Sequence, residues 1–390
     1  MRRWLAPLVI AATVGCTQTD TVPVIRSADV ERPLPEAEAP EPGWYRLPTS
    51  PLSPRQNANA FWTGTEVLIV GGRRPFPCFE ECAFEPPPFR DGAAFDPAAG
   101  EWRRIAKAPI RLGYAQGAVL GETLYLLVPE YYFGWLVSDD EARREPPAFL
   151  AYDISTDEWR DLPQPPGRRW PSYLIATEDR LIGYAESHDR GRRPDLVFDP
   201  STEAWTRLPA DPLGRAYDRS MVWTGSELVL IGVPYPGEPW IARAAAFDPA
   251  ADRWRTLPDP GISGLDPVWF WSSGRVVNPS LDLSEEERDG GSRVGAMFDP
   301  ATSSWEPLPD PPSDYGPYQD LLVGGDEVVV STSGWALHVP SGTWERLTRP
   351  FEGLYANEAS VWAGDRLVVW GGHRDGRFVN QGWAWVPPWA

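Results

Sequence analysis

Few residues in this sequence have the chemistry of a catalytic or metal site. The 390 residues include only 3 His and 3 Cys. His188, His338 and His373 lie far apart, and no nucleophile-elbow or zinc motif is present. Cys78 and Cys82 are four residues apart with no His nearby, so in an exported protein the pair favours a disulfide over metal ligation. The sequence therefore predicts no catalytic residue, no metal site and no cofactor.

Residues suited to ligand binding are more numerous than residues suited to catalysis, and they are arginines and aromatic residues. Four arginines each lie just before a β-rich segment, and a ring of them would favour an anionic ligand; they are Arg55, Arg111, Arg169 and Arg215. The alternative is that each pairs with a neighbouring Asp or backbone carbonyl. Aromatic residues gather in long segments between β-rich runs and suit a sugar ring, a peptide or a protein; they are Tyr131, Tyr132, Trp135, Tyr235 and Trp240. These rings could equally pack beneath their own loops.

An internal repeat explains where these residues fall. The unit is an aromatic residue, Asp, Pro, a short variable stretch, and then Trp six residues after the Asp. Phe95-Asp96-Pro97 with Trp102 is a clear copy. Asp and Pro favour a tight turn, and Trp supplies apolar surface for the next strand. We therefore predict a β-hairpin in each copy.

Upstream of each hairpin, a second pattern predicts two more strands, often ending in Gly-Gly. Residues 60–72 and 360–372 are the clearest copies. Each repeat thus contains four strands. The combination of Gly-Gly, aromatic-Asp-Pro and Trp resembles the kelch repeat, as in the central propeller of galactose oxidase, and extends over residues 44–390. The resemblance implies an all-β fold of the β-propeller type.

The repeat Trp residues count the blades. They are Trp44, Trp102, Trp159, Trp205, Trp254, Trp305 and Trp344. The 347 residues of 44–390 divide into seven blades of about 50 residues. Trp44 begins a fourth strand with no three strands before it, and the chain after residue 354 supplies three strands with no fourth. We therefore expect a seven-bladed propeller whose last blade is closed by the N-terminal strand, which removes an exposed edge.

The N-terminal residues indicate export. Residues 1–16 combine Arg2 and Arg3 with a short apolar run that ends at Cys16. This arrangement is similar to a bacterial lipoprotein signal peptide in which Cys16 is lipidated, although Thr13 replaces the usual Leu. Residues 17–43 are rich in Pro and Glu and predict an extended tether. We expect a lipid-anchored protein that faces the periplasm or the cell exterior.

Charge and motif content narrow the function. Asp and Glu number 55 against 36 Lys and Arg, a net charge of −19, which argues against nucleic acid as a partner. The sequence favours a non-catalytic binding or scaffold protein with a protein or glycan ligand, in contact with the membrane only through its anchor. The alternative is a propeller enzyme acting on a sugar, such as a sialic acid mutarotase-like epimerase. Kelch oxidases need a copper set of His, Tyr and Cys that this sequence does not match.

Overall fold

The repeated aromatic-Asp-Pro pattern forms the predicted hairpin. Phe95 on β4 (Gly92–Asp96) lies opposite Trp102 on β5 (Glu101–Ile105), with 5.0 Å between the ring centroids. The Asp96 carboxylate accepts hydrogen bonds from the backbone N–H groups of Ala98 and Ala99 at 2.8 and 3.0 Å, which closes the turn. Four other hairpins repeat this aromatic–Trp pair with centroids 4.9–5.3 Å apart.

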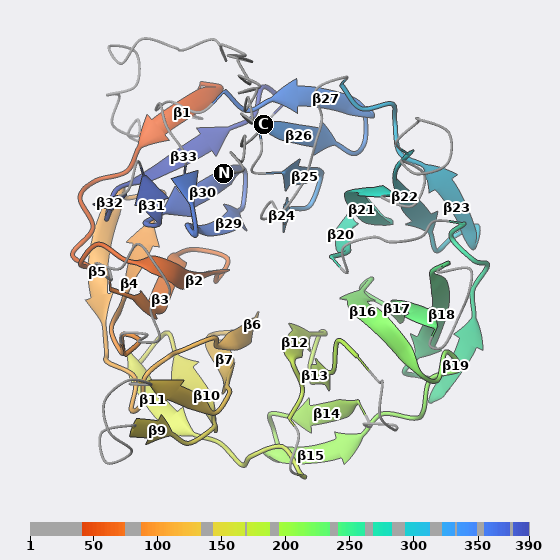
Figure 1. Cartoon of the computed structure of the whole chain (residues 1–390), viewed down its shortest axis with the longest axis horizontal. Helices are drawn as coiled ribbons and strands as arrows, with labels where there is room; N and C mark the ends of the chain where they lie inside the picture. The colour runs from red at the N-terminus through yellow and green to blue at the C-terminus, as the bar shows by residue number, and fades with distance from the viewer. Residues whose placement is uncertain are drawn as a thin grey trace, which may run out of the picture.

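These hairpins are the outer halves of seven four-stranded antiparallel sheets, arranged as blades around a central axis in a computed structural model of the chain (Figure 1). The structure describes residues 41–74, 87–133, 143–167, 170–187, 195–234, 241–261, 268–282, 293–312, 322–331, 334–348, 355–374 and 377–389. The predicted seven-bladed β-propeller is therefore confirmed.

Within each of the first six blades the strands follow chain order from the axis outward (Figure 1). Blades 1 to 3 are β2 (Gln56–Trp62), β3 (Val67–Arg73), β4 and β5; β6 (Gln116–Leu120), β7 (Thr123–Val128), β10 (Ala148–Asp153) and β11 (Glu158–Asp161); and β12 (Tyr173–Ala176), β13 (Leu181–Tyr184), β14 (Leu196–Asp199) and β15 (Ala204–Arg207). Blades 4 to 6 are β16 (Ala216–Trp223), β17 (Leu228–Pro234), β18 (Arg243–Asp248) and β19 (Arg253–Thr256); β20 (Phe270–Ser272), β21 (Arg275–Asp282), β22 (Arg293–Asp299) and β23 (Ser304–Pro307); and β24 (Leu322–Gly324), β25 (Val328–Ser331), β26 (Trp335–His338) and β27 (Thr343–Arg346).

The seventh blade joins the two ends of the propeller. It consists of β29 (Ala359–Ala363), β30 (Arg366–Trp370), β33 (Gly382–Val386) and β1 (Gly43–Arg46). β1 pairs antiparallel with β33, so that Trp44 lies opposite Trp385 and Tyr45 opposite Ala384. Without β1, the polar backbone groups on the outer edge of β33 would have no partner strand. The expected closure by the N-terminal strand is confirmed.

The hydrophobic core lies between neighbouring blades. On β3, Val67 and Ile69 pack in a cluster that includes Val368 and Trp370 of blade 7. The alternate residues of the same strand, Leu68 and Val70, pack toward blade 2. This alternation follows from the two-residue period of a β-strand, and it makes each second strand apolar on both faces.

The repeat Trp residues also join the blades through hydrogen bonds. In six blades the indole Nε1–H donates to the backbone carbonyl four residues after the Trp of the preceding blade. The donor and acceptor pairs are Trp102–Pro48, Trp159–Ala106, Trp205–Pro163, Trp254–Pro209, Trp305–Pro258 and Trp344–Pro309, at 2.7–3.2 Å. The ring thus packs in its own blade while its polar atom reaches the next.

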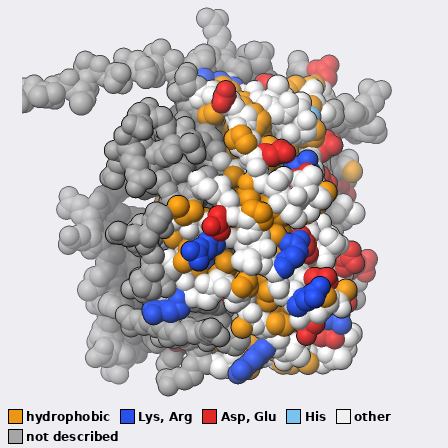
Figure 2. All heavy atoms as spheres, turned by 90° about the vertical axis from the view of Figure 1, so that its right-hand side faces the viewer, with side chains coloured by type: hydrophobic (Ala, Val, Ile, Leu, Met, Phe, Trp, Pro, Cys, Tyr) orange, Lys and Arg blue, Asp and Glu red, His pale blue; other side chains and the backbone are white. Residues whose placement is uncertain are grey.

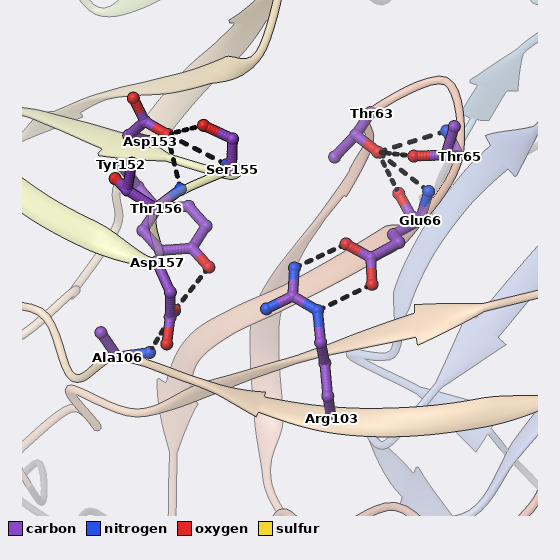
Figure 3. Close-up of polar contacts among 10 residues, drawn as sticks. All are labelled: Thr63, Thr65, Glu66, Arg103, Ala106, Tyr152, Asp153, Ser155, Thr156 and Asp157. Carbon is purple, nitrogen blue, oxygen red and sulfur yellow. Dashed lines mark hydrogen bonds and ion pairs between the residues drawn. The ribbon is translucent and has the colours of Figure 1, made fainter.

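Antiparallel strands give the propeller two different faces. We call the face with the hairpin turns the turn face, because it carries the short connections between first and second and between third and fourth strands. Figure 3 shows its polar contacts in blades 1 and 2. Arg103 donates two hydrogen bonds to Glu66 at 2.8 and 2.6 Å. Asp157 accepts from the Tyr152 hydroxyl and the Ala106 backbone N–H, each at 2.7 Å, and so links blades 1 and 2.

We call the opposite face the loop face, because the connections between second and third strands and between successive blades leave from it. The Gly-Gly pair at the end of β3 begins one such loop. Gly71 and Gly72 have φ angles of +68° and +82°, and a Cβ atom on Gly71 would lie 2.7 Å from the Leu112 carbonyl oxygen. Only glycine fits this close approach without strain. No helix among the described residues is long and apolar enough to cross a membrane.

Candidate functional site

Two small sheets extend the loop face beyond the blades. Blade 2 carries the hairpin of β8 (Tyr131–Phe133) and β9 (Arg143–Glu145) between its second and third strands. Blade 7 carries β28 (Tyr355–Ala356), β31 (His373–Arg374) and β32 (Arg377–Phe378). Because the blades hold these additions by both ends, the loop face has ordered elements on which binding residues can be placed.

The structure covers only part of the aromatic set expected on this face. Tyr131 and Tyr132 lie on β8, opposite Glu145 and Arg144 in the strand register, and their side chains are outside what the structure describes. The other three aromatic candidates are outside the described residues, as are four further candidates; these seven are Trp135, Tyr235, Trp240, Arg169, Cys16, Cys78 and Cys82. Their roles stay predictions.

Arg55 is fully buried and fixes the loop of blade 1. Its Nη1 donates to the Gly71 carbonyl and to Asp91 Oδ1, both at 2.8 Å, and its Nη2 donates to Asp91 Oδ2 at 3.2 Å. Gly71 and Asp91 lie at the two ends of the loop between β3 and β4. The Phe89 ring covers the guanidinium at 4.0 Å. Arg55 therefore joins the two ends of this loop, which is the pairing alternative given above.

A second buried arginine, Arg219, joins the two ends of the corresponding loop in blade 3. Its guanidinium donates to Asp195 at 2.7 and 3.1 Å, to Asp211 at 3.2 Å and to the Ala185 carbonyl at 2.7 Å. Ala185 and Asp195 lie at the two ends of the loop between β13 and β14. Arg215 was predicted from the sequence as a binding residue, whereas Arg219 was not predicted. The available signal was a run of polar residues, 217–220, at the start of an otherwise apolar inner strand.

The other two described arginine candidates have different environments. Arg111 is half-buried, with its Nε 3.4 Å from Glu145 Oε1 and its Nη1 donating to the Pro88 carbonyl at 3.0 Å. Arg215 is exposed. Arg55, Arg111 and Arg215 thus differ from fully buried to exposed, and among the described residues they do not form a set of equivalent groups around the axis.

Four inner strands have, at their loop-face end, a non-glycine residue in the left-handed backbone conformation. Asn57, Tyr114, Asp218 and Asn357 have φ angles of 51°, 52°, 51° and 59°. Asn and Asp adopt this conformation more readily than other non-glycine residues, whereas for Tyr it is strained. The Asn57 N–H donates to the Asn357 carbonyl at 2.8 Å, which joins blades 1 and 7 at this level. Since inner strands surround the axis, these residues lie around the axis on the loop face (Figure 1).

Tyr114 is the most exposed large hydrophobic residue in the described part of the chain, with 56% of its surface accessible. The Arg73 guanidinium carbon lies 3.9 Å from the centroid of the Tyr114 ring, and Arg73 itself is only 7% exposed. The cation packs on one side of the ring and is shielded by the protein, while more than half of the Tyr114 surface faces solvent. Tyr114 was not among the binding residues predicted from the sequence.

The histidines are the side chains best suited to acid–base catalysis or metal binding near neutral pH. His338 occupies the turn position taken by Asp in other blades, and its Nδ1 lies 2.7 Å from the Ser341 hydroxyl. His373 lies on β31, with its ring 5.3 Å from that of Phe378. His188 is outside the described residues. No group of three or more His, Cys, Asp or Glu side chains within the described ranges could hold a metal ion.

One comparison with known proteins agrees with the repeat pattern. No family model matches the sequence. The Kelch-like protein terF of Aspergillus terreus is 26% identical over 321 residues, which span 77% of this chain and 67% of terF. The solved structure of YjhT aligns with 86% of this chain and 96% of its own, at 14% sequence identity and a TM-score of 0.43. The chain is therefore a seven-bladed β-propeller whose repeats resemble kelch repeats and whose sequence is similar to that of the Kelch-like protein terF.

Proposed function

We propose that this protein is a non-catalytic binding protein that holds a glycan on its loop face. The observation that carries the proposal is the Tyr114 ring, which is exposed on the loop face just before the inner strand of blade 2 and is backed by the buried Arg73. Sugar rings stack on exposed aromatic faces and use polar side chains around them to fix orientation. Asn57, Asp218 and Asn357 supply such polar groups at corresponding positions on the same face.

A glycan array with the purified protein tests this function. The variant Tyr114→Asn removes the ring and retains a residue that tolerates the left-handed backbone, so the fold is preserved. We expect it to weaken glycan binding roughly tenfold or more, as expected for the loss of a stacked aromatic contact. Trp271→Ala is the control, because Trp271 is 36% exposed but lies on the turn face, close to Gly274 and Arg275 of the turn after β20. A protein captured specifically by the loop face, with no glycan bound, would contradict the proposal.

One pair of residues favours the alternative of a sugar-modifying enzyme. Arg111 and Glu145 lie 3.4 Å apart on the loop face, each about one-third exposed or less. A positioned guanidinium next to a carboxylate could hold a sugar and exchange a proton with it. NMR measurement of the interconversion of sugar anomers, with the wild type and with Glu145→Gln, tests this activity. Acceleration that the variant abolishes would replace the binding proposal.

We further propose that the protein is exported and anchored through a lipid on Cys16, with residues 17–43 as the tether. The supporting features are the paired arginines, the short apolar run and the small residues before Cys16. Metabolic labelling with palmitate, comparing the wild type with Cys16→Ser, tests the anchor. Loss of label and release from the membrane fraction in the variant are expected.

A further inference from the structure

The turn face contains a pocket between blades 3 and 4 that plays no part in the proposed loop-face function. Its volume is about 300 Å³. The interior is apolar and includes Ile182, Leu208, Trp223 and Phe247, and the opening carries acidic residues from the turn between β12 and β13. This volume is at the lower end of the range for small-molecule sites, so the pocket suits a compact ligand.

The pocket differs from the corresponding places between blades 6 and 7 and between blades 7 and 1. In blades 6 and 7, the turn between the first two strands presents a glycine to the Trp of the following blade. An added Cβ atom on Gly325 would lie 2.4 Å from Trp362, and one on Gly364 would lie 3.6 Å from Trp62. These Trp rings therefore pack directly over the glycine, which leaves no room for a ligand.

Blade 3 has Glu178 at this turn position, and the Trp of the following blade is Trp223. Ala176, Trp62, Trp223 and Trp362 are equivalent, since each pairs across the turn with the residue five positions further along the chain. Blade 3 therefore lacks both the glycine and the Trp found in blade 7. Glu178 and Trp223 both line the pocket.

The charges at the opening favour a cation. Arg180 lies 2.8 Å from Asp179 and 3.3 Å from Asp199, so one guanidinium serves two carboxylates. Glu178 is exposed and has no ion pair or hydrogen bond within the described residues. The whole chain has a net charge of −19. In Figure 2, acidic side chains are more frequent toward the right-hand side of the view. An anion would meet net repulsion here, whereas an ammonium group would gain the Glu178 carboxylate.

We propose that this pocket binds a small organic cation with an aromatic or aliphatic body, of the arylalkylamine class. The apolar body would lie against Trp223 and Phe247, and the ammonium group would pair with Glu178 at the opening. An aromatic wall next to a carboxylate is the combination that recognises such amines, because the ring attracts the cation and buries the hydrocarbon. The site lies on the opposite face from the glycan site and is independent of it.

Calorimetric titration of the full-length protein with phenethylamine and with 3-phenylpropionate tests the proposal, because the two probes have similar bodies and opposite charges. We expect the amine to bind and the acid not to bind. Glu178→Gln should weaken amine binding about fivefold, as expected for one exposed carboxylate–ammonium pair. Glu178→Lys should abolish amine binding and allow the acid to bind. Substitution at this exposed position does not disturb the core.

The matched control is Asp365→Asn in blade 7. Its turn has the same Asp-Arg pair as blade 3, with Arg366 Nε 2.6 Å from Asp365, but carries Gly364 in place of Glu178. This variant removes one carboxylate from an equivalent turn that has no Glu at the pocket position, so amine affinity should be unchanged. Equal binding of amine and acid, equal effects of the Glu178 and Asp365 variants, or no amine binding at millimolar concentration would each overturn the proposal.

Discussion

The indole Nε1 of Trp102 in blade 1 donates a 3.0 Å hydrogen bond to the carbonyl oxygen of Pro48, which follows the last strand of blade 7. Five further junctions repeat this bond. The seventh, between blades 6 and 7, does not. There the buried Nε1 of Trp44 has no hydrogen-bond partner within the described residues. The junction where the N-terminal strand completes the ring thus differs from all the others in its polar contact.

This difference predicts opposite outcomes for two similar substitutions. Trp102→Phe keeps an aromatic ring but leaves the Pro48 carbonyl without its donor, and we expect a loss of about 1 kcal/mol in the free energy of unfolding. Trp44→Phe removes a buried donor that has no partner, so its effect should be about 0.5 kcal/mol or less in either direction. Urea denaturation of both variants measures the comparison. Equal destabilisation would show that ring packing, and not the hydrogen bond, decides the result.

Closure by β1 predicts that the N-terminal strand stabilises the whole propeller. Deletion of residues 17–50 removes β1 and exposes the edge of β33, so the midpoint of thermal unfolding should fall by at least about 5 °C. Deletion of residues 17–40 is the control, because it retains every residue of β1. A midpoint that does not move in the larger deletion would mean that blade 7 is stable with three strands.

The buried ion pairs of Arg219 lead us to predict a large loss of stability when this side chain is removed. Arg219→Ala leaves Asp195 and Asp211 without their shared guanidinium, and we expect a loss of about 3–5 kcal/mol in the free energy of unfolding. Arg215→Ala, four residues away on an exposed side chain, should cost about 0.5 kcal/mol or less. Should the first variant be too unstable to purify, Asp211→Asn removes one partner of the network and should show a smaller loss. Equal effects at 215 and 219 would contradict the assignment.

The raised pKa of Tyr152 leads us to predict that the protein loses stability at high pH. Burial, followed by the hydrogen bond to Asp157, raises the pKa of Tyr152 to about 12 in the folded protein, above its ordinary value near 10. The folded state therefore retains this proton better than the unfolded chain. The resulting stability is fully present below pH 10 and is lost as the pH rises toward 12. Urea denaturation between pH 9 and 12 should show this fall.

Tyr152→Phe is the matching control, since it removes the titrating hydroxyl and should make the decline shallower. The decline should not vanish, because burial also raises the pKa of Tyr184 to about 12. An unchanged slope in the variant would mean that Tyr152 does not contribute to the pH dependence.

Local sequence determined most of the fold. The Asp96 turn and the Phe95–Trp102 pair depend on residues within one hairpin, so their pattern could be read directly and counted along the chain. The count of seven, and the two incomplete ends around Trp44 and residues 359–386, then required closure by the N-terminal strand. Steric limits at Gly-Gly and the two-residue strand period are equally local, which explains why these predictions held.

Tertiary structure alone decided what the charged and aromatic residues do. Arg55 and Arg215 occupy similar sequence positions, yet one is buried against Asp91 and the other is exposed. The loop-end partners of Arg55 and Arg219, which are Gly71, Asp91, Ala185 and Asp195, lie 16 to 36 residues away and meet them only when the blades form. The Tyr114–Arg73 pair and the Glu178–Trp223 pocket each join two blades. Sequence fixes the local conformation of each blade, but contacts between blades depend on where the ring places their side chains.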